Sequence, residues 1–140
     1  MRNYNILLVD SCKTDIEYTK NAFSVLDIKH TLYTAETEIQ AWAMLQGNNK
    51  LTPLPEILII DINEEGINGI DLLRKIRIHP DLKSILVFVI TAADNEENRI
   101  AAINLNIAGY FRKPIEKKNF PDFFSILNDY WNLVEFPSKK

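Results

Sequence analysis

Short apolar runs that do not alternate with polar residues constrain the fold of this chain most strongly. Three runs, "NILLV" (5–9), "EILII" (56–60) and "ILVFVI" (85–90), are almost entirely apolar. This pattern is typical of parallel strands that are buried on both faces, because helices cover both sides of such a sheet. "HTLYT" (30–34) alternates polar and apolar residues, as edge strands do, and "AGYF" (108–111) predicts a fifth strand.

Helical patterns separate these strands. They cover residues 14–26, 36–46, 71–78 and 95–105, and a last segment over 120–134 with apolar side chains three and four apart. On the second helix we expect Ile39, Trp42 and Ala43 to face the core, and on the fourth helix we expect Ile100 and Ile103 to do so.

The resulting βαβαβαβαβα order has short connections and no interdomain linker. Right-handed crossovers then favour a doubly wound α/β sandwich, in which five helices cover a five-stranded parallel sheet. The length of 140 residues fits one domain over positions 1–140.

Composition excludes several classes of function. A formal net charge of -3 and a pI of about 5.4 argue against non-specific nucleic-acid binding and against a basic membrane-binding patch. No apolar stretch approaches the roughly 20 residues of a membrane-spanning helix. Cys12 is the single cysteine, so there is no intrachain disulfide, and with no signal-peptide pattern we expect a cytoplasmic protein.

Polar residues stand where the strands end. Strand ends are followed by Asp10-Ser11, Asp61, Thr91-Ala92 and Lys113-Pro114. Because ligands bind beyond the carboxyl ends of the strands in such folds, two carboxylates, a hydroxyl and an ammonium should meet at one edge. Phosphoryl transfer needs positioning and charge neutralisation, so Asp61 fits a nucleophile, with Lys113 and Thr91 holding the phosphoryl oxygens.

Four segments together resemble the receiver domain of response regulators in two-component signalling. They are "ILLVDS", "LIIDINEEGINGIDLLRKIR", "VFVITA" and "GYFRKP", and the resemblance covers essentially the whole chain. The aromatic end, "FPDFFSILNDYWNLVEFP", is similar to stand-alone small receivers that partner phytochrome-type sensor kinases. The resemblance implies the flavodoxin-like strand order 2-1-3-4-5. It also implies a signalling switch rather than an enzyme, which receives a phosphoryl group from a sensor histidine kinase or phosphotransfer protein.

The resemblance also assigns roles to single residues. Asp61 would accept the phosphoryl group, and Mg²⁺ would be bound by Asp10, by Asp61 and by the backbone carbonyl of Asn63. The residues implied in phosphate binding and switching are Thr91, Ala92, Lys113 and Tyr110. The helix 4–strand 5–helix 5 face would contact partners, including a second copy of the chain.

Two positions depart from the family pattern. Ser11 stands where a second acidic metal ligand is usual, and a hydroxyl binds magnesium less well than a carboxylate. Glu64 and Glu65 occupy a stretch in which a proline is common. We expect weakened magnesium binding, with water or Glu64 partly filling the vacancy, or with Glu64 repelling the phosphoryl group. The alternative is a pseudo-receiver that acts only as an interaction module and is not phosphorylated.

Simpler interpretations accompany these assignments. Asp10 or Ser11 would cap the first helix, Tyr110 would be a core aromatic, and His30 and His79 would be surface or edge residues. The last helix would use its aromatics in the core, or present a partner surface from Trp131 to Phe136. A flavodoxin-like or nucleotide-binding enzyme is a further alternative, but "DSCKTD" lacks the glycines of a phosphate-binding loop.

Overall fold

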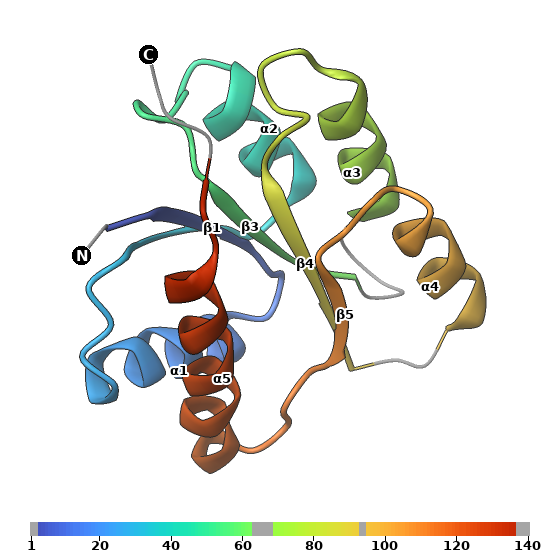
Figure 1. The fold of residues 1–140 in the computed structure, drawn as a ribbon. Helices are drawn as coiled ribbons and strands as arrows, with labels where there is room; N and C mark the ends of the chain where they lie inside the picture. Colours follow the sequence, from blue (N-terminus) through green and yellow to red (C-terminus); the bar gives the residue numbers. More distant parts are fainter. Residues whose placement is uncertain (1–2, 63–68, 93–94, 137–140) are drawn as a thin grey trace.

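Five parallel strands form the centre of the computed structural model, which describes residues 3–62, 69–92 and 95–136. The strands are β1 (Asn5–Val9), β2 (Thr31–Ala35), β3 (Ile57–Asp61), β4 (Leu86–Thr91) and β5 (Gly109–Arg112). Their order is β2-β1-β3-β4-β5, and every neighbouring pair is parallel (Figure 1). The predicted fold class and strand order are therefore confirmed.

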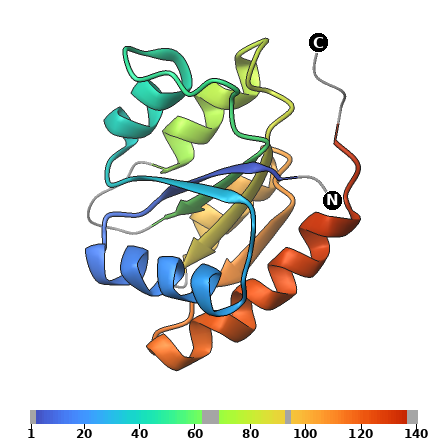
Figure 2. The same ribbon diagram turned by 90° about the vertical axis from the view of Figure 1, so that its left-hand side faces the viewer.

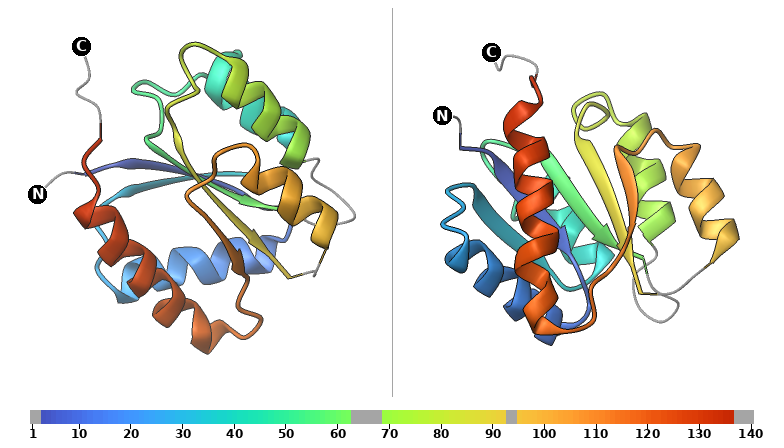
Figure 3. Two further views of the ribbon diagram at one scale, coloured as in Figure 1. Left: turned by 45° about the vertical axis from the view of Figure 1, so that its right-hand side comes forward. Right: turned by 60° about the horizontal axis from the view of Figure 1, so that its bottom comes forward.

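Helices cover both faces of the sheet. They are α1 (Lys13–Val25), α2 (Glu38–Gln46), α3 (Gly69–Ile78), α4 (Glu96–Ile103) and α5 (Phe120–Leu133), with a 3-10 turn η1 (Lys117–Asn119) before α5. The helices α2, α3 and α4 lie on one face, and α1 and α5 lie on the other (Figures 1 and 2). Figure 3 shows α1 and α5 side by side below the sheet.

Residues of the central strands alternate between two apolar clusters. In β1, Leu7 and Val9 pack with α2, α3 and α4, whereas Ile6 and Leu8 pack with α1 and α5. The second cluster is rich in aromatic rings, and Trp131 of α5 is fully buried in it. Burial on both faces explains why these strands lack polar alternation.

The inner faces predicted for two helices were wrong in part, although Trp42 of α2 packs against the apolar cluster as predicted. Ile39 of α2 is 79% exposed, and Ile100 and Ile103 of α4 are 52% and 55% exposed. The buried positions belong to Ala41 and Leu45 in α2 and to Ala102 in α4. Small side chains allow a helix to pack close to its neighbours, and a search for large apolar residues misses them.

His30 is also buried, against the prediction of a surface or edge residue. It is 8% exposed, and its Nδ1 accepts a hydrogen bond from the Tyr4 backbone N–H at 3.0 Å. Its ring lies 4.8 Å from that of Tyr4 and 6.1 Å from that of Trp131. Burial lowers the pKa of His30, which suits a neutral ring that accepts a hydrogen bond.

Two backbone hydrogen bonds position the polar residues at the carboxyl edge of the sheet. Asp10 N–H donates to Ala35 O at 2.9 Å, and Lys113 N–H donates to Thr91 O at 2.8 Å. Pairing therefore continues one residue beyond β1 and β5, so the chain is held in register where the side chains Asp10 and Lys113 leave the sheet.

Candidate phosphoryl-transfer site

The Lys113 ammonium lies among three carboxylates at the carboxyl edge of the sheet. Its Nζ is 2.7 Å from Asp10 Oδ2, 2.7 Å from Asp61 Oδ2 and 2.7 Å from Asp15 Oδ2. Asp10 follows β1, Asp61 is the last residue of β3, and Lys113 follows β5. The structure thus brings together the two carboxylates and the ammonium that the strand ends indicated, and it adds Asp15 from α1.

Only one carboxylate oxygen of Asp61 accepts a hydrogen bond from the described residues. Its side chain is 5% exposed, and Oδ2 accepts a hydrogen bond from Lys113. Oδ1 is also buried and accepts no hydrogen bond from the residues that the structure describes. A carboxylate oxygen in this state retains lone pairs for a cation or an electrophile.

Asp10 uses both oxygens. Oδ1 accepts a hydrogen bond from the Cys12 backbone N–H at 2.9 Å, and Oδ2 accepts one from Lys113. The N-cap position of α1 belongs to Cys12, whose side chain makes no capping bond, so the prediction of Asp10 or Ser11 as the cap was wrong. Asp10 instead binds the backbone at the start of the helix. Cys12 itself is an exposed free thiol.

Burial and charge oppose each other in this cluster. Burial raises the pKa of Asp10 to about 6, despite the opposing effect of the Lys113 hydrogen bond. For Lys113, burial alone would lower the pKa, but hydrogen bonds to Asp10, Asp15 and Asp61 outweigh it and raise the pKa above its ordinary value. The ammonium therefore stays charged and holds the cluster together.

The residues implied in switching lie at the end of β4 and on β5. Thr91, the last residue of β4, is 3% exposed, and its Oγ1 donates a hydrogen bond to Ile62 O at 2.7 Å. Ala92 follows and is exposed. Tyr110 of β5 is half-buried and packs against the cluster under α2, α3 and α4. Asn63, Glu64 and Glu65 lie outside the described residues.

Sequence reasoning missed Asp15. The residue stands in the first turn of α1, so its closeness in sequence to the end of β1 at Asp10 was the available signal. Strand ends were the only source of site residues considered, and a side chain on a helix start escaped that search.

The oxygen donors of this site fit a hard divalent cation. Magnesium in proteins is bound by one or two carboxylates and keeps several waters, and Asp61 Oδ1 is a buried oxygen with no donor among the described residues. Within the described ranges, no group of three or more His, Cys, Asp or Glu side chains forms a metal site. A cation here would therefore take few protein ligands.

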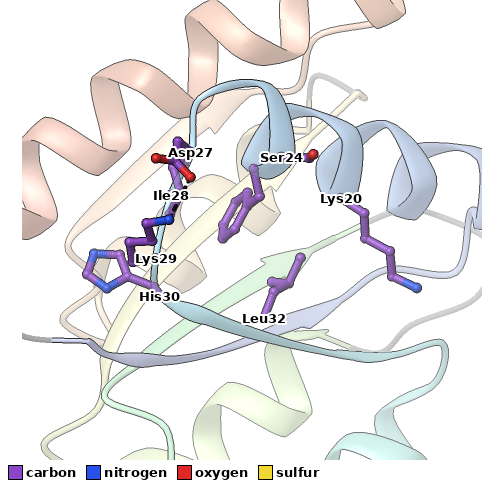
Figure 4. A pocket seen from close by; sticks show the side chains of 8 residues that line it. Lys20, Ser24, Asp27, Ile28, Lys29, His30 and Leu32 are labelled. Carbon is purple, nitrogen blue, oxygen red and sulfur yellow. Dashed lines mark hydrogen bonds and ion pairs between the residues drawn. The ribbon is translucent and has the colours of Figure 1, made fainter.

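A separate hollow of about 310 Å³ lies at the other end of α1 (Figure 4). It is lined by Lys20, Phe23, Ser24, Asp27, Ile28, Lys29, His30 and Leu32. Lys29 and Asp27 pair with each other at 2.8 Å and are largely exposed. This hollow lacks the buried charges of the Lys113 cluster, so the chemistry belongs to the carboxyl edge.

Fold and site together define a class of protein. The model of the response regulator receiver domain matches residues 6–123, and the chain belongs to this family, the receiver domains of two-component response regulators. Such domains interact with histidine kinases or phosphotransfer proteins and bind Mg²⁺ or Mn²⁺. Among the described residues, no helix is both long and apolar enough to span a bilayer.

Individual relatives are similar over most of their length. Response regulator Rcp1 from Synechocystis is 30% identical over 131 residues, which cover 90% of this chain and 87% of Rcp1. Chemotaxis protein CheY-3 from Vibrio cholerae is 33% identical over 81% of this chain and 82% of its own length. The Mn²⁺-bound structure of Rcp1 matches with a TM-score of 0.84 at 28% identity, covering 96% of this chain and 99% of that one. The phosphorylated cyanobacterial phytochrome response regulator RcpA has a TM-score of 0.85 at 23% identity over 98% and 100% of the chains, and it supports the fold.

Proposed function

We propose that this chain is a phospho-accepting signalling switch and that Asp61 is the acceptor. The observation that carries the proposal is the state of the Asp61 carboxylate, with one oxygen on Lys113 and the other accepting nothing from the described residues. Asp10 has both oxygens in use, so it is the poorer nucleophile. The role also makes the chain a signalling module that acts on itself, rather than an enzyme for other substrates.

The reaction would be an in-line displacement at phosphorus. Asp61 Oδ1 forms a bond to the phosphorus atom, the bond from phosphorus to the donor histidine nitrogen breaks, and that nitrogen keeps the electron pair. Lys113 stays beside the new acyl phosphate and neutralises part of its charge. Asp10, Asp61 and the carbonyl of Asn63 would hold Mg²⁺, which when bound neutralises the oxygens of the transferring group.

Thr91 supplies the two-state element of the switch. Its hydroxyl now donates to Ile62 O, and the new phosphate offers a charged acceptor in the same region. Charge-assisted hydrogen bonds are about twice as strong as neutral ones, so phosphorylation favours the conformation in which Thr91 binds phosphate. Ala92 follows Thr91 directly, and Tyr110 lies on the neighbouring strand β5. The backbone of Ala92 and the ring of Tyr110 would pass the conformational change on to the surface of the domain.

The pseudo-receiver is the second candidate. It is favoured by Ser11, which is exposed and cannot replace a carboxylate as a ligand. The contacts of Lys113 with Asp61 and Asp10 argue against it, because a module that only binds partners does not need them.

Incubation with acetyl phosphate and Mg²⁺, followed by intact-mass measurement, separates the two candidates. We expect wild type to gain one phosphoryl group and Asp61→Asn to gain none. Thr91→Ala serves as the matched control, because it should still be phosphorylated while losing the conformational response. A wild type that gains no mass at any magnesium concentration would support the pseudo-receiver.

The partner surface would lie on α4, β5 and α5. Exposed apolar side chains gather on these elements and on the loop after β5, namely Ile100, Ile103, Ile115, Ile126, Tyr130 and Leu133. We propose a homodimer contact there. We also propose a phytochrome-type sensor kinase as the donor, because the aromatic end of the chain resembles small receivers that partner such kinases. Sedimentation should show a dimer for wild type and a monomer for Leu133→Glu. A dimer that survives this change would move the contact elsewhere.

Several broader assignments complete the proposal. We take residues 1–140 as a single receiver domain that acts in the cytoplasm, where a kinase uses ATP. The net charge of -3 speaks against nucleic acid or an anionic membrane surface as a partner.

A further inference from the structure

Asp15 brings to Lys113 a third carboxylate that no strand end supplies. It lies in the first turn of α1, its side chain is 21% exposed, and its Oδ2 is 2.7 Å from Lys113 Nζ. Its neighbours on the helix differ, since Thr14 is exposed and Glu17, with a side chain 71% exposed, pairs with Lys20. The rotation of α1 therefore directs Asp15, and not these neighbours, to the site.

The charges at this point do not balance. Asp10, Asp15 and Asp61 share the single ammonium of Lys113, which leaves a formal excess of two negative charges among these four groups. Independently, Asp61 Oδ1 is buried without a donor from the described residues. Buried charge that is not compensated destabilises a fold, so both observations point to a second cation, and a divalent one would remove the excess.

Hydrogen-bond capacity leads to the same conclusion. A lysine ammonium has three N–H donors, and the three carboxylates engage Lys113 from three sides. Lys113 can bind an oxygen of a phosphoryl group only when one carboxylate leaves it. Asp15 is the most exposed of the three, at 21% against 1% for Asp10 and 5% for Asp61, and is therefore the one that can leave.

The position of Asp15 relative to Ser11 indicates where it would go. Ser11 is exposed and lies just before the N-cap of α1, four residues ahead of Asp15. Both residues therefore lie at the start of α1, next to the end of β1 where a carboxylate at position 11 would stand, and Asp15 already reaches the Lys113 ammonium there.

We infer that Asp15 supplies a further carboxylate to the magnesium site, beside Asp10 and Asp61 and in place of the acid that is missing at Ser11. The inference rests on the proposed function. When Mg²⁺ binds, Asp15 serves the cation, directly or through a metal-bound water, and Lys113 gains a free donor for the phosphoryl oxygens. Metal binding thereby prepares the site for the phosphoryl group. This removes the need for Glu64 as the substitute ligand.

Calorimetric titration with Mg²⁺ tests this role in the full chain, using wild type and Asp15→Asn. We expect Asp15→Asn to weaken binding about tenfold or more, because it loses a carboxylate oxygen of the site. The matched control Glu17→Gln removes one charge from the exposed side of the same helix and should change affinity less than about twofold.

Two double variants separate a ligand from a distant charge. Asp15→Asn with Ser11→Asp should regain most of the affinity, whereas Asp15→Asn with Thr14→Asp, which returns the charge to the solvent side, should not. Equal affinity of Asp15→Asn and wild type, or equal recovery in both double variants, would overturn the inference. Circular dichroism checks folding, and Asp15→Ser replaces Asp15→Asn in the titration should the latter fold poorly.

Phosphorylation measured in parallel distinguishes this inference from the proposed function. Wild type that is phosphorylated on Asp61, together with unchanged magnesium affinity in Asp15→Asn, contradicts the role of Asp15 and leaves the signalling function intact. Wild type that binds no Mg²⁺ and gains no phosphoryl group contradicts both.

Discussion

The carboxylate of Asp10 is buried at the carboxyl edge of the sheet, and its charge lowers the stability of the fold. Asp10 is completely buried, and burial raises its pKa from 3.8 to about 6, so the folded state holds the proton of this carboxyl more tightly than the unfolded chain does. Its contribution to the free energy of unfolding therefore falls as the pH rises from about 4 through about 6. At neutral pH the protein maintains a buried carboxylate that costs stability.

Asp10→Asn should accordingly stabilise the fold at neutral pH, by about 1 to 3 kcal/mol, because it removes this buried charge and keeps an oxygen for the Cys12 N–H. The gain should shrink as the pH falls below about 6, where folded wild-type Asp10 takes up a proton, and should vanish at about pH 4. Urea unfolding followed by tryptophan fluorescence at several pH values measures both effects. Asp27→Asn, in an exposed pair with Lys29, is the control and should change little. A loss of stability at neutral pH would mean that the Lys113 ion pair outweighs burial.

The pattern of apolar residues predicted the strands better than it predicted the buried faces of the helices. β3 could be placed from its run of Ile57, Leu58, Ile59 and Ile60, because a short, β-branched apolar run is typical of a strand buried on both faces. In α2 and α4 the isoleucines Ile39, Ile100 and Ile103 lie outside, whereas Ala41 and Ala102 are fully buried. Which side of a helix faces the sheet depends on packing partners that a local pattern does not contain.

The aromatic segment at the end of the chain belongs mainly to the core. In α5, Phe124 and Trp131 are 1% and 0% exposed, whereas Leu133 is 83% exposed. The ring of Phe136 lies 4.5 Å from that of Tyr4, so the segment after α5 also packs on the N-terminal part of the chain. Among the large apolar residues from Trp131 to Phe136, Leu133 is therefore the one exposed enough to contact a partner.

Trp131→Ala should therefore destabilise the protein by about 3 to 5 kcal/mol, as other large-to-small core substitutions do. Trp131→Phe should cost much less, because it keeps a ring and removes an indole N–H that has no acceptor among the described residues. Leu133→Ala is the exposed control, with an expected change below about 0.5 kcal/mol. Denaturant unfolding gives all three values. Similar losses for Trp131→Ala and Leu133→Ala would contradict the division of α5 into a buried and an exposed side.

For the molecule as a whole, parallel strands explain why so much of the site could be predicted. The carboxyl ends of all five strands lie at one edge, so Asp10, Asp61, Thr91 and Lys113 had to come close once the strands were identified. Asp15 could not be found in this way, because its place depends on the rotation of α1 about its axis. That rotation is set by packing against β1, β3 and α5.

The same topology connects the proposed acceptor with the proposed partner surface. Asp61 lies on the central strand β3, whereas the exposed apolar residues lie on α4 and α5 beside the edge strand β5. Thr91 on β4 stands between them, with its backbone carbonyl bonded to Lys113 N–H. Under the proposed function, a change at Asp61 would reach the proposed partner surface through β4 and β5.

Locating the phosphoryl group within the acidic cluster tests the central claim most directly. After treatment with acetyl phosphate and Mg²⁺, borohydride reduces an aspartyl phosphate to homoserine, and peptide mass spectrometry identifies the residue. Homoserine at position 61 and at no other acidic residue is the result predicted here. Homoserine at Asp10 or Asp15, or none at all in protein shown to bind magnesium, would contradict the assignment of Asp61 as the phosphoryl acceptor.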